Sequence, residues 1–178
     1  SRYTVDEDWI IPHFEKMLYD NTQFILLLSK YCKINNQDYF KEKLEQTIEF
    51  LKKNFENTQG FLGSAYDADS EGEEGKYYVY SYEEIKNLEN ITHYFEVKPK
   101  GNWENKIILV EKNKPPKVIL DKLLEIRSKR KKPFFDDKTQ LDLNCLWLSA
   151  LIAANKVLPK KGYLKLAEKY YSRVEKKY

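Results

Sequence analysis

Cysteine is scarce in this chain of 178 residues, which contains only Cys32 and Cys145. Two isolated thiols without a Cys-x-x-Cys pair exclude a disulfide framework, a cysteine metal site and a dithiol redox motif within this sequence. This usage favours a reducing, cytoplasmic compartment. Long apolar runs are missing too, since the longest, residues 24–28, has only the size of a helix core. We therefore expect no membrane-spanning segment and no membrane partner.

A strong excess of one charge is also absent, because 31 basic residues stand against 28 acidic residues, for a net charge of +3. This near balance argues against a nucleic-acid partner. The basic run 127–132 could bind phosphates, but at the end of a predicted helix it is more typical of a solvated helix terminus. Apolar residues are plentiful at 42%, with 15% aromatic, which is enough for the core of one globular domain.

Apolar residues recur at three- and four-residue steps over much of the chain, which predicts long amphipathic helices. Pro12 stands where the first turn of a helix tolerates proline, Asp38 is expected to cap the second helix, and Pro133 to follow the end of the third. The helix around Trp147 is apolar nearly all round, which predicts a place deep inside a larger assembly of helices. The expected helices cover approximately residues 13–33, 38–55, 116–132, 141–157 and 163–174.

Glycines interrupt the helical pattern between about residues 57 and 116. Short apolar stretches at 77–80 and 107–110 predict the strands of a small β-hairpin insert. Ser81 followed by Glu84 matches a capping box, which predicts a short helix from Tyr82 to about residue 88. We expect residues 1–178 to form one partial domain of helical hairpins with this insert between them.

Residues 67–76 are the most informative polar feature, because five carboxylates and two glycines occupy ten positions. Their spacing resembles the start of a calcium loop, but Tyr78 stands where a bidentate glutamate is required, so we expect no metal site. Two interpretations remain open: the carboxylates accept backbone N–H groups and fix the following hairpin, or they line the pocket of a polyol ligand. The five carboxylates belong to Asp67, Asp69, Glu71, Glu73 and Glu74.

A second concentration of polar side chains opens the first predicted helix. His13, Lys16 and Asp20 are stepped by three and four and would share one helix face, with Glu15 and Tyr19 on the adjoining face. Such side chains can donate and accept protons, as glycoside hydrolysis and epimerisation next to a carbonyl both require. The alternative is a structural role, with a hydrogen-bonded histidine and an ordinary polar contact between helices.

Two further features leave alternatives open. Asp136, Asp137 and Lys138 precede the helix predicted at 141–157, where an aspartate is a good cap, although one of these acids could face a cavity instead. The aromatic residues would suit stacking on sugar rings, and equally a plain core. The tryptophans are Trp9, Trp103 and Trp147.

Several motifs, in this order, resemble one protein family: residues 2–6 with Trp9, then 12–21, 66–80, 101–104, 127–130 and 136–138. On these motifs the chain is similar, from Arg2 to about Ala154, to the YyaL-like family of spermatogenesis-associated, thioredoxin-fused proteins. The resemblance implies a thioredoxin-like domain followed by an α/α toroid similar to the sugar 2-epimerases and six-hairpin glycosidases. Because the chain begins at Ser1, we expect it to be a processed product or a piece of such a longer protein. Residues 143–145 depart from the family pattern, reading Leu-Asn-Cys where the family usually has Trp-Asn-Gly.

The resemblance therefore predicts a mainly α fold, an incomplete α/α toroid of helical hairpins. The expected function is carbohydrate-active, epimerase- or glycosidase-like, with a small sugar or polyol as ligand and no cofactor. The expected partners are the rest of the toroid and a thioredoxin-like domain in the longer protein. The residues expected to act in catalysis are His13, Glu15, Tyr19, Asp67 and Asp69. Those expected to bind substrate are Lys16, Asp20, Asn21, Glu71, Glu74, Asp137 and Asn144.

Two other functions stay open at this point. The toroid could be a non-catalytic scaffold that presents a substrate or partner to the thioredoxin-like domain in a redox pathway. It could also be an inactive remnant. Half a toroid would leave apolar helix faces exposed, and such a chain should self-associate.

Overall fold

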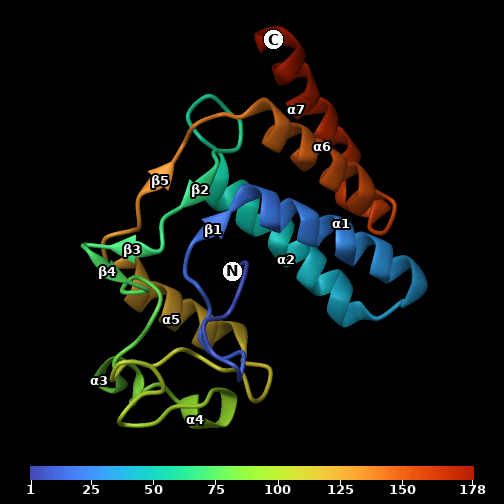
Figure 1. The fold of residues 1–178 in the computed structure, drawn as a ribbon. Helices are drawn as coiled ribbons and strands as arrows, with labels where there is room; N and C mark the ends of the chain where they lie inside the picture. Colours follow the sequence, from blue (N-terminus) through green and yellow to red (C-terminus); the bar gives the residue numbers. More distant parts are fainter. The chain divides into compact units, whose positions relative to one another are not determined.

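The computed structural model describes all residues 1–178 and shows a mainly helical chain with small antiparallel sheets (Figure 1). The chain divides into two compact units. The first consists of residues 1–15 and 67–134, and the second of residues 16–66 and 135–178. None of the helices combines the length and the apolar character that crossing a bilayer requires.

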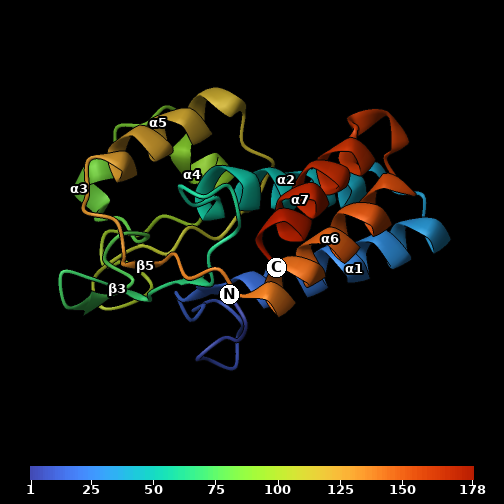
Figure 2. The same ribbon diagram turned by 90° about the horizontal axis from the view of Figure 1, so that it is seen from above.

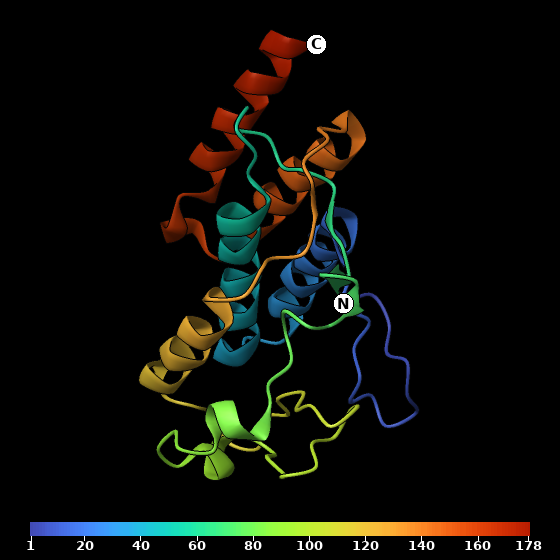
Figure 3. The ribbon, with the colours of Figure 1, turned by 90° about the vertical axis from the view of Figure 1, so that its left-hand side faces the viewer.

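The second unit contains the long helices α1 (Leu18–Ile34), α2 (Asp38–Phe55), α6 (Leu141–Asn155) and α7 (Tyr163–Lys177). Figures 2 and 3 show α1 beside α2 and α6, and α7 beside α6. A short 3₁₀ turn, Pro159–Lys161, joins α6 to α7. The core between these helices is apolar and includes Leu18, Ile25, Leu44, Ile48, Leu51, Phe55, Trp147 and Leu151. The expected helices at 38–55, 141–157 and 163–174 are therefore confirmed to within a few residues.

A three-stranded antiparallel sheet ties the loops of this unit together. It has the order β1 (Lys16–Met17), β2 (Ala65–Tyr66) and β5 (Phe135–Asp136). Buried Asn144 joins α6 to the loop that precedes β2. Its side-chain oxygen accepts the N–H of Leu62 and its amide donates to the carbonyl of Leu62, both at 3.0 Å. One side chain thus satisfies both backbone groups of a buried loop residue.

The first unit is built around α5 (Lys117–Ser128), which lies beside the short helices α3 (Tyr82–Ile85) and α4 (Ile91–Tyr94) in Figures 1 and 2. Their shared core contains Tyr80, Ile85, Ile91, Phe95, Ile107, Ile119 and Leu123. The capping box at Ser81 is confirmed, because its hydroxyl accepts the N–H of Glu84 and the Glu84 carboxylate accepts the N–H of Ser81. The helix that it starts ends at Ile85, earlier than expected.

The first long helix begins at Leu18, so the expectation of a helix from His13 is wrong. The N–H of His13 donates to the carbonyl of Tyr3, and the N–H of Leu18 donates to the carbonyl of Ser64. These backbone groups therefore pair with residues distant in sequence and not within a helix. Met17, between them, is extended. Lys16 lies in a strand, and His13 and Glu15 lie in the loop before it. His13, Lys16 and Asp20 therefore do not share a helix face.

The strands expected at 77–80 and 107–110 are also wrong as regular strands. Residues 75–78 form a turn, in which the carbonyl of Gly75 accepts the N–H groups of Tyr78 and Val79. Only Tyr80 and Ile107 pair across this region, as an isolated bridge. The regular hairpin lies earlier, within the acidic stretch itself, as β3 (Asp69–Ser70) and β4 (Glu73–Glu74).

Aspartate caps were expected at two helices and are found at neither. The N-cap of α2 is Gln37, with Asp38 as the first helical residue, and the N-cap of α6 is Gln140. Neither cap side chain hydrogen-bonds to its helix. Asp136 instead belongs to β5, because pairing with β2 holds it away from the helix start.

Helix α6 buries one side only. Trp147, Ala150 and Leu151 are fully buried, but Leu141 and Ile152 are exposed on the same helix. Helix α1 likewise exposes Phe24, Leu27, Tyr31 and Ile34. The expectation that α6 is surrounded by helices is therefore not met within this chain.

We expect Asn144→Ala to lower the free energy of unfolding by about 2–4 kcal/mol, because the N–H and C=O of Leu62 would lose their partners in a buried loop. Urea unfolding measures this change. Cys145→Ala, one position along the same helix but exposed, is the matched control and should change stability by less than about 0.5 kcal/mol. Equal stabilities for the two variants would contradict the assignment.

Candidate functional site

Phe14 fixes the N-terminal segment of the first unit. Its ring is buried, stacks with Tyr78 at 5.8 Å between ring centroids, and lies 5.2 Å from the ring of Trp103. Gly75 lies directly against it, since a Cβ built there would come within 2.5 Å of a ring carbon. Phe14 thus holds its neighbours His13 and Glu15 next to the acidic hairpin.

The acidic stretch forms a tight hairpin whose two-residue loop is Glu71-Gly72. Both loop residues have positive φ, 55° and 79°, as a type I′ turn requires. The carboxylates of this hairpin differ in their partners. Glu73 is ion-paired with Lys76 at 2.8 Å, whereas Glu74 lies 3.9 Å from Nε2 of His13. The hairpin thus brings one carboxylate of the stretch to the histidine.

A second tight turn, residues 103–106, lies in the same unit. Glu104 and Asn105 both have positive φ, 46° and 60°, and Trp103 pairs with Lys106 across them. Non-glycine residues adopt such backbone angles at an energetic cost, which is characteristic of positions that the surrounding structure determines. Asn102 supports the turn by exchanging two hydrogen bonds with the backbone of Ile108.

His13 is held by contacts on three sides. Its ring stacks on Tyr3 with centroids 4.5 Å apart, and its Nδ1 lies 4.0 Å from a carboxylate oxygen of Glu15. That carboxylate is also ion-paired with Arg2. Nδ1 is buried and has no hydrogen-bond partner, which is unusual for a histidine nitrogen. Both ring nitrogens therefore face a carboxylate beyond hydrogen-bond distance, so a small movement would allow proton transfer.

Arg130 organises the opposite side of this region. Its guanidinium donates to the carbonyls of Lys76, Tyr77 and Val79 and lies 4.9 Å from the centre of the Tyr80 ring. It also donates to Glu84 at 2.8 Å. Only 18% of its side chain is exposed, so the expectation that this basic run is simply solvated is wrong for Arg130. Arginine suits this role because its rigid fork can donate to several oxygens at once.

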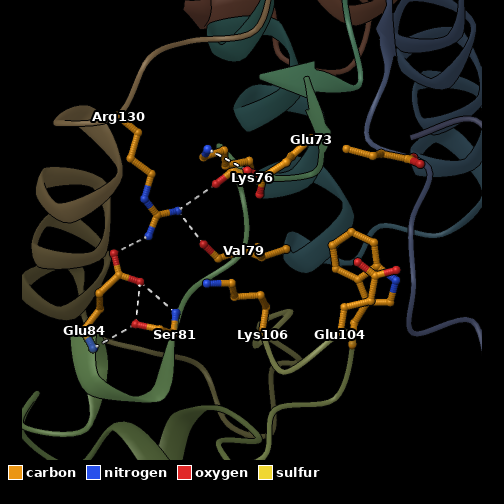
Figure 4. A pocket seen from close by; sticks show the side chains of 10 residues that line it. Glu73, Lys76, Val79, Ser81, Glu84, Glu104, Lys106 and Arg130 are labelled. Atoms are coloured by element: carbon orange, nitrogen blue, oxygen red, sulfur yellow. Dashed lines mark hydrogen bonds and ion pairs between the residues drawn. The ribbon is translucent and has the colours of Figure 1, made fainter. Parts of the chain in front are cut away.

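These segments enclose a cavity of about 490 Å³ in the first unit (Figure 4). In Figure 4 the guanidinium of Arg130 points between Glu84 and the backbone of residues 76–79. Glu74 lines the cavity and approaches His13, so it connects the histidine with this space. The remaining lining side chains are Glu73, Lys76, Val79, Ser81, Glu84, Trp103, Glu104, Lys106 and Arg130.

The structure divides the expected site residues between the two units. It brings His13, Glu15 and Glu74 together in the first unit. Asp67, Asp69 and Glu71 belong to the same unit, but their carboxylates are exposed and do not contact His13. The others lie in the second unit: Lys16, Tyr19, Asp20, Asn21, Asp137 and Asn144.

Local hydrogen bonds occupy some residues of this second group. The amide of Asn21 donates to the carbonyl of Met17, and the side chain of Asn144 is engaged with Leu62 and Gln140. Their part in substrate binding stays a prediction. The structure contains no cluster of three or more His, Cys, Asp or Glu side chains arranged to hold a metal ion.

Sequence reasoning missed several residues that line the cavity. The sequence gives no role to Lys106, and it marks Trp103 and Glu104 only as part of the motif 101–104 of the family resemblance and Trp103 as one of the aromatic residues. Glu84 was recognised only as a helix cap. Arg130 and residues 101–104 belong to the motifs that carry the family resemblance, and this was the signal that the sequence offered; the structure shows that both motifs reach the same cavity.

No family model matches the chain. Over 93 residues, 49% of this chain, it is 32% identical to Spermatogenesis-associated protein 20 of Homo sapiens and 33% identical to the protein of that name in Mus musculus. It is 27% identical, over 94% of its length, to an uncharacterized protein of Caenorhabditis elegans. The chain is thus distantly homologous to these proteins. It spans 12% of the mammalian proteins and 30% of the nematode protein.

We expect Gly75→Ala to destabilise the chain more than Gly72→Ala. Both glycines have positive φ, 69° and 79°, so each substitution costs about 1 kcal/mol for the backbone alone. Only at Gly75 does the added methyl group meet the Phe14 ring, which should add about 1–3 kcal/mol. Urea unfolding compares the two variants, and equal losses would show that Phe14 does not pack on Gly75.

The stability of the first unit should fall in acid partly through Glu84. Burial alone would raise the pKa of this carboxyl, but hydrogen bonds from Ser81 and Arg130 outweigh it and hold the pKa below its ordinary value of 4.5. The ionised form is therefore favoured by folding, so its contribution is complete above the ordinary pKa and is lost as the pH falls through the lowered pKa.

We test this with Glu84→Gln in urea unfolding at neutral pH and at about pH 3. Glu84→Gln should be less stable than the parent at neutral pH, and the difference should shrink in acid. Glu83→Gln, an exposed neighbour in the same helix, is the control and should behave like the parent at both pH values. A difference that stays constant with pH would contradict the prediction.

Proposed function

We propose that the first unit binds a small sugar or polyol in the 490 Å³ cavity and that Glu74 exchanges protons with it. The observation that carries the proposal is His13, whose buried Nδ1 lacks a hydrogen-bond partner while its Nε2 lies 3.9 Å from Glu74. In this arrangement Glu74 is the group that touches the ligand, and His13 is a positioning residue. Glu15, which is ion-paired with Arg2, lies 4.0 Å from Nδ1 of His13 on the other side of the ring.

The cavity lining suits a polyhydroxylated ligand. Trp103 offers an aromatic surface against which a sugar ring can stack. Lys106 and Ser81 supply hydrogen-bond donors, and Glu104 supplies an acceptor without an ion pair of its own. A pocket of a few hundred cubic ångströms with a few convergent polar groups has the character of a small-molecule site.

Proton transfer is the chemistry that this set of groups supports. A carboxylate next to a histidine can remove a proton from a carbon beside a carbonyl, as in epimerisation, or activate water, as in glycoside hydrolysis. Both reactions need a second group, and Glu104 and Lys106 are the candidates in the cavity. The substrate that is turned over decides between the two reactions: an aldose indicates epimerisation, and an oligosaccharide indicates glycoside hydrolysis.

We further propose that the second unit is part of an α/α toroid in a longer, thioredoxin-fused protein. The exposed apolar residues of α1 and α6 support this, because further helices of a toroid would cover them. The much greater length of the homologues leaves room for such helices. A cytoplasmic location stays a prediction from cysteine usage.

The test of the sugar site is a panel of aldoses and oligosaccharides, scored by turnover and by the rise in melting temperature. We expect one class of sugar to raise the melting temperature and to be turned over. Glu74→Gln should then reduce turnover by about 10²-fold or more, and Trp103→Ala should weaken binding. His13→Gln should lower turnover and change its pH profile without loss of binding.

Glu71→Gln is the matched control, because Glu71 lies in the same hairpin but does not line the cavity. It should keep full turnover and binding. Failure of every sugar to raise the melting temperature, or equal losses in Glu71→Gln and Glu74→Gln, would refute the proposal. Melting temperatures of the ligand-free variants separate loss of the site from loss of the fold.

The apolar sides of α1 and α6 favour a second candidate, a non-catalytic scaffold that binds a partner protein. If this is correct, the longer protein should trap partners through its thioredoxin-like domain only when the helical part is present, and sugars should have no effect. Light scattering on the 178-residue chain tests a third candidate, an inactive remnant, for which we expect self-association; a monodisperse monomer would contradict it.

A further inference from the structure

His13 lies between two carboxylates that belong to different segments of the first unit. Glu15, in the N-terminal segment of residues 1–15, has a carboxylate oxygen 4.0 Å from Nδ1. Glu74, in strand β4 of the acidic hairpin, has one 3.9 Å from Nε2. An N–H···O hydrogen bond spans about 2.7–3.2 Å, so both carboxylates lie just beyond that range. The imidazole thus faces the segment with one edge and the hairpin with the other.

A neutral imidazole cannot donate a hydrogen bond to both carboxylates. In either tautomer it has one N–H donor and one acceptor nitrogen, and an ionised carboxylate only accepts. One nitrogen of neutral His13 therefore faces a carboxylate with no proton between them, and the buried Nδ1 has no hydrogen-bond partner. A protonated imidazole has two N–H donors, so it is the form that fits both neighbours.

The charges around the ring favour the same form. Arg2 is ion-paired with Glu15, so these two charges balance each other. The ammonium of Lys76, in the same hairpin region as Glu74, is paired with other carboxylates of the hairpin. Glu74 has no ion pair other than its contact with His13. One proton on His13 would therefore neutralise this group of side chains.

Packing holds the ring in this position. The Tyr3 ring stacks on it with an angle of 17° between the planes, and the N–H of His13 donates to the carbonyl of Tyr3 at 3.0 Å. The next residue, Phe14, is buried. The charged and titratable side chains around the imidazole are Arg2, Tyr3, Glu15 and Glu74. Among these types of side chain and histidine, only histidine ordinarily changes its charge between about pH 5 and pH 8.

We propose that His13 is a pH switch that joins the N-terminal segment to the acidic hairpin. When His13 takes up one proton from the solvent, its two N–H groups bind Glu15 and Glu74, and each carboxylate moves closer by about 1 Å. No other group changes its charge in this step. When the proton is released, at least one of the two hydrogen bonds is lost and the segment and the hairpin are joined less tightly.

The switch regulates the candidate sugar site, a consequence that rests on the function proposed above, in which Glu74 exchanges protons with the ligand. A carboxylate bound to an imidazolium is a weaker proton acceptor than a free one. Turnover by the parent should therefore fall several-fold between about pH 8 and about pH 5.5. His13→Gln, which we expect to be less active throughout, should not show this fall.

Hydrogen exchange followed by mass spectrometry tests the switch without any ligand. The parent and His13→Gln are compared with each other at about pH 8 and at about pH 5.5, so the pH dependence of the intrinsic exchange rate cancels. Residues 3–13 and 69–74 should be the segments that respond. We expect the ratio of their exchange rates, variant over parent, to be at least about threefold larger at the lower pH, because only the parent forms the two additional hydrogen bonds.

His93→Gln is the matched control, because His93 is the other histidine of the chain, lies in the same unit and is exposed outside the cavity. Its exchange ratio should be the same at both pH values. Glu74→Gln removes one carboxylate of the switch and should abolish the pH response of the hairpin. Unchanged exchange of the second unit at about pH 8 shows that a variant is folded.

A ratio for His13→Gln that is the same at both pH values, or an equal rise in His93→Gln, would overturn the proposal. The two proposals fail separately. If the exchange ratio changes with pH but no sugar binds, only the proposed function is refuted. If a sugar is turned over but the exchange ratio is constant, only the pH switch is refuted.

Discussion

The burial of one ring, Phe14, against a glycine is the contact on which the first unit depends. Without a side chain at Gly75 the ring can enter between Tyr78 and Trp103, where its burial contributes about 1.5–3 kcal/mol. The N-terminal segment, the acidic hairpin and the turn at 103–106 converge on this ring. Each of these loops is irregular, so their packing against one another takes the place of a sheet or helix in positioning side chains.

Hydrogen bonds from side chains to backbone complete this arrangement in both units. Arg130 binds the carbonyls that follow the acidic hairpin, and Asn102 binds both backbone groups of Ile108. Asn144 does the same for Leu62 in the second unit. Buried loops contain backbone N–H and C=O groups that have no partner in a helix or a sheet, and a planar amide or guanidinium can bind two or more of them at once.

The sequence predicted several individual residues of the candidate site, but it did not predict which of them the fold brings together. The sequence singled out His13, Glu15 and the acidic stretch, and the structure brings the first two next to Glu74. The expected grouping by helix face failed, because His13 precedes the helix. Within the acidic stretch, the type I′ turn decides which carboxylate reaches the histidine, and its geometry depends on pairing between β3 and β4.

The sequence by itself determined the four long helices of the second unit. Their apolar residues recur at helical spacing, and this spacing does not depend on which other segment each helix packs against. It also determined the capping box at Ser81, a contact between residues three apart. Only the tertiary structure decided where the first helix begins and that residues 75–78 form a turn. In those places the backbone groups are bound by Tyr3, Ser64 and Arg130, which are distant in sequence, and no local pattern records such partners.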